Sequence, residues 1–123
     1  MGNVQVLEKK YDLAERTKEF ALSVINFSRK LPVNNTSRIL ISQVVRSGTS
    51  IGANYSEADN AESKGDFRHK ISICKKEAKE TIYWLSLIAR AFPCLDANAQ
   101  ELEQEAIEPN RIFCAIVKKV DLK

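Results

Sequence analysis

The sequence predicts an all-α protein in which four long helices form an antiparallel up-down-up-down bundle. Its 123 residues suit a single domain with one core, spanning residues 1–123. Four glycines and three prolines are few turn-forming residues for this length, which indicates few turns and long elements. Apolar residues recur at steps of three and four in four successive segments, with no alternating strand pattern. Because the connections are short, neighbouring helices are expected to run antiparallel.

The first helix is predicted from about Asp12 to Leu31. Asp12 can cap its first turn, because a carboxylate accepts hydrogen bonds from the free amides there. Pro32 ends it, since proline lacks an amide proton and disfavours helical dihedrals in the preceding residue. The apolar face consists of residues spaced by three, four or seven: Leu13, Phe20, Val24, Phe27 and Leu31.

The second helix is predicted from the cap-forming residues 34–36 to about Ala61. Gly48 and Gly52 lie inside it, and each costs about 1 kcal/mol relative to alanine. Close approach of another helix to this small-residue groove would compensate that cost. Alternatively, the segment from Gly48 to Gly52 is a break between two shorter helices. The core-facing stripe is Leu40, Val44, Ser47, Ile51, Asn54, Ala58 and Ala61.

The third helix, from about Lys64 to Phe92, has the clearest pattern in the chain. Ser63 is its N-cap candidate, with Asp66 as an approximate capping-box partner, and Pro93 ends it. Residues alternate at steps of four and three for more than three heptads, which is typical of a helix packed in a bundle. This seam is Phe67, Ile71, Cys74, Ala78, Thr81, Leu85, Ile88 and Phe92.

A second apolar stripe flanks this seam, at Trp84, Leu87 and Ala91. An apolar band wider than one seam indicates contact with another protein chain, although a broad band is equally common on a central core helix.

The fourth helix is predicted to start at Asp96, a possible cap, and to keep the same spacing to the end of the chain. Pro109 interrupts it. An interior proline costs about 3 kcal/mol and bends or divides a helix, so we expect either a bend near residues 107–109 or two pieces meeting there. The periodicity keeps its phase across the proline, which favours the bend. The stripe is Leu102, Ala106, Pro109, Phe113, Ile116 and Val120.

The sequence names no catalytic residue, metal ligand set or cofactor motif, and we expect a protein that is not an enzyme. Its single histidine, His69, is expected to be solvated, and one histidine cannot supply the paired Glu-x-x-His motifs of a di-iron bundle. The three cysteines at 74, 94 and 114 form no CxxC pair and are interpreted as reduced thiols. Without a membrane-spanning run or a leader-like N-terminus, a cytoplasmic protein is the simplest expectation, with no membrane partner.

Charge is uneven along the chain, whose net charge is +3. Residues 64–90 hold seven cationic and three acidic residues, a local net charge of +4. Such a helix could neutralise phosphates of RNA or DNA, or it could be a solvated face in which Lys76 pairs with Glu80. Few aromatic residues interleave with the charges, so the pattern gives little support for base stacking. The candidate nucleic-acid-binding residues are Arg38, Arg46, Lys64, Arg68, Lys75, Lys76 and Lys79.

Several ordered motifs carry a family resemblance. They are RSGTSIGANYSEA at 46–58, SKGDF at 63–67, KEAKET at 76–81 and YWL at 83–85, together with the segment from Tyr11 to Leu31. The chain resembles the four-helix-bundle family encoded within intervening sequences of bacterial large-subunit ribosomal RNA genes, some members of which carry a ribosomal-protein label. The resemblance implies a ring-like homopentamer. It also implies a relationship to accessory proteins of diversity-generating retroelements, which bind nucleic acid and a reverse transcriptase.

The resemblance sharpens a second set of candidates, at a tight helix crossing or a boundary between subunits. Aromatic residues are enriched in interface cores, and buried polar groups must be paired. We therefore hypothesise that Arg46 and Glu57 share one network with Lys75 or Glu77. The candidates are Gly48, Gly52, Ala53, Asn54, Tyr55, Glu57, Tyr83 and Trp84.

Two functions remain open on the sequence. One is a non-enzymatic oligomer that binds RNA or DNA through a basic surface on the second and third helices. The other is a protein-interaction or scaffold module, which recruits an unidentified protein through its apolar flank and uses its lysines only for solubility.

Overall fold

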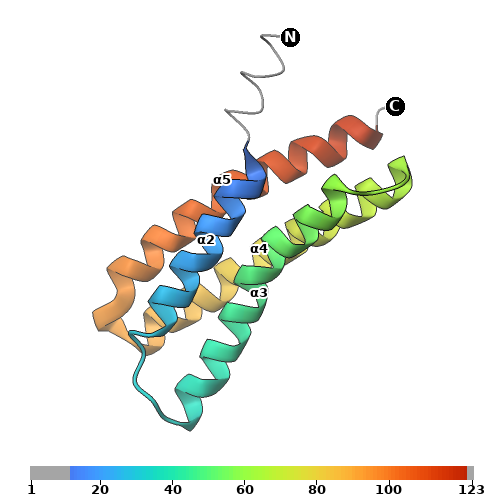
Figure 1. Ribbon diagram of the computed structural model, residues 1–123. Coiled ribbons are helices and arrows are strands. Elements are labelled where there is room, and N and C mark those ends of the chain that lie inside the picture. The colour runs from blue at the N-terminus through green and yellow to red at the C-terminus, as the bar shows by residue number, and fades with distance from the viewer. Residues whose placement is uncertain (1–11, 122–123) are drawn as a thin grey trace.

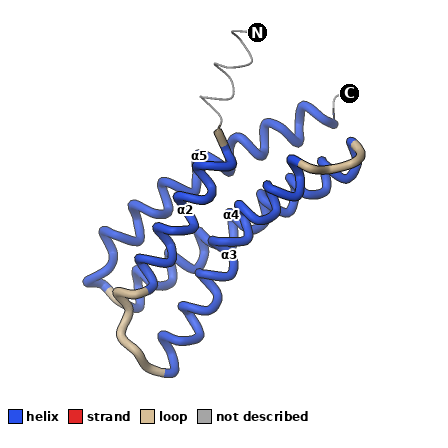
Figure 2. The backbone as a smooth tube through the Cα atoms, in the orientation of Figure 1, coloured by secondary structure: helices blue, strands red, loops and turns tan. Residues whose placement is uncertain are grey.

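The computed structural model describes residues 12–121, and Tyr11, named above with the family motifs, lies outside them. This part of the chain holds four α-helices and no strand. The helices are α2 (Leu13–Ser28), α3 (Asn35–Asp59), α4 (Lys64–Ala91) and α5 (Asp96–Asp121). A single 3₁₀ turn, η1 (Pro93–Leu95), joins α4 to α5. Figures 1 and 2 show the four helices running up and down beside one another.

The helices pack in a closed cycle. α2 lies beside α3 and α5, and α4 lies beside α3 and α5. Within residues 12–121 the backbones of the diagonal pairs, α2 with α4 and α3 with α5, do not approach one another closely. This is the arrangement of an antiparallel up-down-up-down bundle, in which each helix buries one face against two neighbours. The predicted fold class is confirmed.

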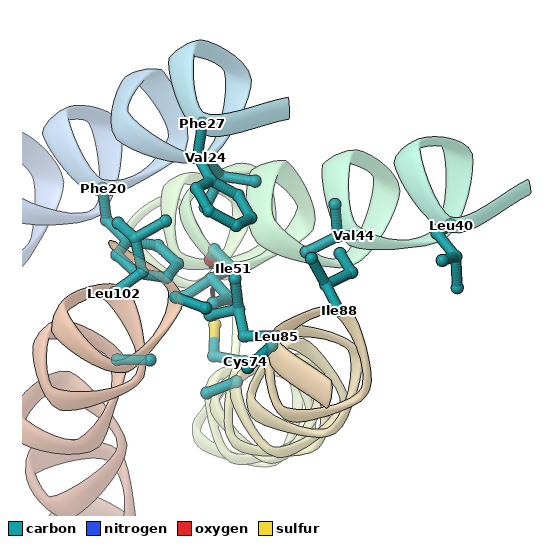
Figure 3. Packing of buried hydrophobic residues seen from close by; sticks show 14 of the residues in the cluster. Phe20, Val24, Phe27, Leu40, Val44, Ile51, Cys74, Leu85, Ile88 and Leu102 are labelled. Carbon is teal, nitrogen blue, oxygen red and sulfur yellow. Dashed lines mark hydrogen bonds between the residues drawn. The ribbon is translucent and has the colours of Figure 1, made fainter. Parts of the chain in front are cut away.

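The core is built from the predicted stripes. Phe20, Val24 and Phe27 of α2 lie toward residues of α3, α4 and α5 in the centre of the bundle (Figure 3). Burial of this apolar area is the main favourable term in folding, at roughly 25 cal/mol per Å². The fully buried side chains include Val24, Val44, Ile71, Cys74, Leu85, Ile88 and Phe113.

Three helices begin at the caps that the sequence indicated. The side chain of Asp12 accepts a hydrogen bond from the amide of Glu15 (3.2 Å). Asn34 accepts one from the amide of Ser37 (2.9 Å), and Ser63 accepts one from the amide of Asp66 (3.0 Å). Each cap satisfies a donor that the first helical turn leaves free.

Helix ends differ from the expectation by one to three residues. α2 ends at Ser28 and not at Leu31, because the amides that follow bond to carbonyls three residues back and close a turn ahead of Pro32. In that turn the amides of Lys30 and Leu31 bond to the carbonyls of Phe27 and Ser28. α3 ends at Asp59, two residues before the expected end at Ala61. α4 ends at Ala91, one residue before the expected end at Phe92. Leu31 is nevertheless buried, so the stripe continues into the turn.

The glycines of α3 lie against α2, and the helix is unbroken through them. The alternative of two shorter helices is wrong. A Cβ atom built on Gly48 would lie 3.0 Å from Cγ1 of Val24, and one on Gly52 would lie 3.0 Å from Oγ1 of Thr17. Close packing of α3 on α2 therefore offsets the low helix propensity of glycine at these two positions.

Pro109 lies inside α5, which is a single helix from Asp96 to Asp121. The alternative of two separate pieces is wrong. Proline cannot donate the amide hydrogen bond that the carbonyl of Glu105 would accept, so the helix is weakened locally. Figure 1 shows the red C-terminal part of α5 running at an angle to its orange first part. The proline ring is buried, and its contacts offset part of that loss.

Substitution of Gly48 by alanine is expected to destabilise the protein although alanine favours a helix. Val24 is fully buried and cannot easily move away from the new Cβ, and overpacking typically costs about 1–3 kcal/mol. Gly65→Ala is the matched control, because the nearest atom to its Cβ lies 4.0 Å away. Urea unfolding should show a gain of about 0.4–1 kcal/mol for Gly65→Ala and a net loss for Gly48→Ala. Equal gains would contradict close packing at Gly48.

Cys74 is expected to be inert to thiol reagents in the folded protein. Its thiol is fully buried and donates to the carbonyl of Ile51 (3.5 Å), and burial raises its pKa to about 12. Cys94 is exposed in η1 and should react rapidly with a disulfide reagent at pH 8. Cys94→Ser should remove that fast phase, whereas labelling of Cys74 should require denaturant. Rapid labelling of Cys74 in the native protein would contradict this core.

Candidate nucleic-acid interface

The candidate surface is built on the contact between α3 and α4. A buried hydrogen bond joins Oγ1 of Thr81 to Oγ of Ser47 (2.9 Å), and Thr81 also bonds to the carbonyl of Glu77 (2.8 Å). Residue 47 therefore lies opposite residue 81. This register places the polar side chains of the two helices at one shared edge, next to the core.

Arg46 forms a fork between two carboxylates of α4. Its Nη1 lies 3.2 Å from Oε2 of Glu77, and its Nη2 pairs with Oε2 of Glu80. The Glu77 side chain is only 10% exposed, whereas that of Arg46 is 48% exposed. A buried carboxylate needs a cationic partner, because an isolated buried charge is strongly destabilising. Arg46 thus holds α3 to α4. Its guanidinium was a candidate for binding phosphate, but it is already paired with two carboxylates.

The hypothesised network is correct for Arg46 and Glu77 but wrong for Glu57. The carboxylate of Glu57 instead accepts a hydrogen bond from Nζ of Lys70 (2.8 Å). Eleven residues separate Glu57 from Arg46, which is about 16 Å along a helix, so the two side chains meet different parts of α4. The hydrogen bond and charge of Glu57 raise the pKa of Lys70 above its ordinary value.

The second carboxylate of the fork continues the network to two aromatic rings. Oε2 of Glu80 accepts a hydrogen bond from the indole Nε1 of Trp84 (3.1 Å). The ring of Tyr83 packs edge to face on Trp84, with centroids 5.1 Å apart and planes at 77°. The predicted pair between Lys76 and Glu80 is not formed, because Glu80 is held by Arg46 and Trp84.

The predicted cationic stripe of α4 does not form one free surface, because Arg68 is paired with an acidic residue of α5. Arg68 makes a bidentate pair with Asp121 of α5, in which Nη2 lies 3.2 Å from Oδ2. The hydrogen bond and charge of Arg68, with a further contribution from Lys75, hold the pKa of Asp121 below its usual range. Arg68 is therefore tied to α5, and Lys75 is half-buried beside the same carboxylate.

Lys64, Lys76 and Lys79 remain exposed, and no carboxylate of residues 12–121 pairs with them. Arg38 is also exposed, but it lies near the start of α3. Because α3 and α4 are antiparallel, Arg38 and Lys64 occupy opposite ends of the bundle. The seven candidates therefore do not form one continuous patch.

The interface candidates fall at two places. Gly48 and Gly52 lie at the α2–α3 crossing, where Ala53 lines a shallow groove with residues of α2. Tyr55 is half-buried, and its ring packs on Phe113 of α5 with centroids 6.2 Å apart. Burial, followed by the charges of Asp59 and Asp12, raises the pKa of Tyr55.

Asn54 lies on α3 near the same crossing, but its amide donates to the Ser50 carbonyl of its own helix (2.9 Å). The remaining candidates, Tyr83 and Trp84, lie on α4, which does not form this crossing. Tyr83 is exposed and Trp84 is half-buried. The interface candidates thus belong to separate parts of the surface.

Sequence reasoning missed the partners that link distant segments. Asp121 pairs with Arg68 across 53 positions, and Lys70 pairs with Glu57 across 13. No local pattern indicates either pair, because each depends on how two helices are rotated against one another. The i,i+4 spacing of Glu80 and Trp84 was the one signal available for the aromatic network.

The described residues show neither a cluster of metal-ligating side chains nor a helix suited to a membrane. Residues 12–121 contain no group of three His, Cys, Asp or Glu side chains placed to hold a metal ion. Among the same residues, none of the helices combines the length and the apolar character needed to cross a membrane.

The sequence and the fold are similar to those of known proteins. The family model for the 23S rRNA-intervening sequence protein matches residues 9–114. A crystal structure of a protein with unknown function from the S23 ribosomal protein family of Bacteroides thetaiotaomicron has a TM-score of 0.74. The two chains are 34% identical, and the match covers 85% of this chain and 97% of that one. No curated protein matches the sequence.

Removal of the Arg46 fork is expected to destabilise the bundle. Arg46→Met leaves the Glu77 carboxylate nearly buried without its partner, and we expect a loss of about 1–3 kcal/mol in unfolding free energy. Adding Glu77→Leu should recover most of that loss, because no buried charge then remains unpaired at that position.

Glu57→Gln is the control for this experiment. It removes an ion pair in which the Glu57 side chain is 60% exposed, so the urea midpoint should not move measurably. Equal effects of Arg46→Met and Glu57→Gln would show that the fork does not hold the two helices together.

Proposed function

The chain belongs to the 23S rRNA-intervening sequence protein family, and from this premise we propose that it is a non-enzymatic helical bundle that binds RNA or DNA. Its contact surface would be the α4 basic face, defined by Lys76, Lys79 and Arg90. Family membership confirms the resemblance seen in the motifs, and the four-helix fold accords with it. The activity itself is our inference from the surface chemistry of α4.

The observation that supports this proposal is the pairing of the acidic residues of α4. Two of its three carboxylates, Glu77 and Glu80, are turned to Arg46 of α3. They therefore do not neutralise Lys76 and Lys79, which lie on the exposed side of the same helix. Phosphates of a nucleic acid could approach these unpaired ammonium groups, and counterion release would make the affinity dependent on salt.

Assembly of several copies would strengthen such a surface. A net charge of +3 per chain is modest, but a ring multiplies it by the number of subunits, and simultaneous contacts add avidity. We propose a homo-oligomer, with the pentamer of the family resemblance as the expected state. The groove between α2 and α3, lined by Ala14, Ala21, Gly52 and Ala53, is the surface we favour for contact between copies.

Exposed apolar side chains favour a second candidate function. Ile39 is 64% exposed on α3 and Leu87 is 38% exposed on α4. Exposed apolar residues that cluster mark protein-interaction sites, so a scaffold that recruits another protein is the alternative to nucleic-acid binding. The two functions differ in their response to salt, because apolar contact does not release counterions.

Charge reversal at the α4 basic face is expected to weaken nucleic-acid binding. Lys76→Glu with Lys79→Glu should lower the affinity for a short RNA at least tenfold at low salt. It should also reduce the slope of log affinity against log salt by about 2, since two phosphate contacts are lost. Fluorescence anisotropy measures the binding, and light scattering of the same samples shows whether assembly is retained.

The matched control is reversal of Arg29 and Lys30, which are exposed just after α2, the helix diagonal to α4, and lie outside the groove between α2 and α3. It changes the net charge equally and should leave most of the affinity. Equal losses from the two pairs would indicate a non-specific effect of net charge. No salt-dependent binding by the unaltered protein would favour the protein-interaction alternative.

A further inference from the structure

Tyr83 is an exposed aromatic residue on the helix that carries the α4 basic face. Its side chain is 59% exposed, although the neighbouring Trp84 is half-buried against the core. The two rings meet edge to face, with planes at 77°. In that geometry Trp84 covers at most one face of the Tyr83 ring, and more than half of the residue stays accessible to solvent.

A chain of polar contacts holds Trp84, on which the Tyr83 ring packs, in place. Trp84 is anchored by its indole hydrogen bond to Glu80, and Glu80 is anchored by Arg46 of α3. Glu77 binds the same guanidinium and is itself nearly buried. The edge contact with Trp84 therefore presents Tyr83 against a fixed surface, which reduces the conformational freedom that a ligand would have to remove.

Cationic side chains lie before and after Tyr83 along the same side of α4. Lys79 is four residues earlier, Lys76 is seven earlier and Arg90 is seven later, so all three share a helical face with the ring. Positions four apart have Cβ atoms about 5–6 Å from each other. All three cations are exposed, and within residues 12–121 none is in an ion pair.

An open aromatic face between cations is the combination by which proteins bind single strands of nucleic acid. The ring stacks on an unpaired base, and the cations contact the phosphates on either side of it. Bases inside a duplex are stacked on one another and do not present their faces, so a duplex would engage only the cations. An apolar protein partner would not require the flanking charges.

We propose that Tyr83 is a base-stacking platform and that the α4 basic face therefore binds single-stranded RNA or DNA in preference to duplex. This inference rests on the proposed nucleic-acid-binding function and names its substrate class. The recognised groups are the face of an unpaired base and its neighbouring phosphates, with no reading of base edges. Arg46 and Glu80 act as positioning residues, because they contact Trp84 or its partner and not the bound strand.

The test compares a short fluorescent oligothymidylate with an abasic strand of the same length and phosphate number. The unaltered protein is expected to bind the oligothymidylate about 5- to 150-fold more tightly, which corresponds to one stacked base. Tyr83→Ala should bind the two strands equally and should keep the salt slope, since its phosphate contacts are intact. Tyr83→Trp should retain the preference.

Leu22→Ala is the matched control, because it truncates a side chain that is 55% exposed on α2. It should bind both strands as the unaltered protein does. Far-ultraviolet circular dichroism, which measures the helix content of the bundle, reports whether each variant is folded. Trp84 is the single tryptophan of the unaltered chain. Stacking of a base on Tyr83 should also change the fluorescence emission of Trp84 in the unaltered protein.

The failures of the two proposals are distinguishable. If Tyr83→Ala keeps the preference for the oligothymidylate, or if duplex binds as tightly as single strand, the stacking inference is overturned. In that case a loss of binding in Lys76→Glu with Lys79→Glu would still support the proposed function. If neither strand binds at low salt, both proposals fail.

Discussion

The nearly buried carboxylate of Glu77 is the constraint on which the α3–α4 pair depends. A negative charge at this depth requires a cation, and Arg46 supplies it from the neighbouring helix. Together with the bond between Ser47 and Thr81, this pair favours the observed rotation of α3 against α4. Apolar packing by itself tolerates many small rotations, whereas a fork between two carboxylates is directional.

The same contact determines which charges reach the surface. Because Glu77 and Glu80 are directed at Arg46, they do not pair with Lys76 and Lys79, which remain exposed on the outer side of α4. Glu80 then holds Trp84, and Trp84 supports Tyr83. A structural ion pair between two helices thereby produces an exposed face that combines positive charge with an aromatic ring.

The α2–α3 contact is held by a different means. There, Gly48 and Gly52 have no side chains, so Val24 and Thr17 of α2 lie close to the α3 backbone. α3 is thus bound to α2 by shape and to α4 by charge. The exposed small-residue groove beside that contact and the aromatic basic face lie on different helices. The proposed assembly and the proposed nucleic-acid binding therefore involve separate surfaces of one small bundle.

The sequence alone determined the class of fold, the number of helices and most of their starting residues, because periodicity and capping are local properties. Asp12, Asn34 and Ser63 act where their positions indicated. It also placed Arg46 in a polar network, with Glu77 as one of two alternative partners on the third helix, and the structure confirms that alternative. The tertiary structure decided that Glu57 pairs with Lys70 and that Arg68 is bound to Asp121. These outcomes depend on the rotation and tilt of packed helices, which set the partner of every side chain at a helix edge and are not encoded in the spacing of any single segment.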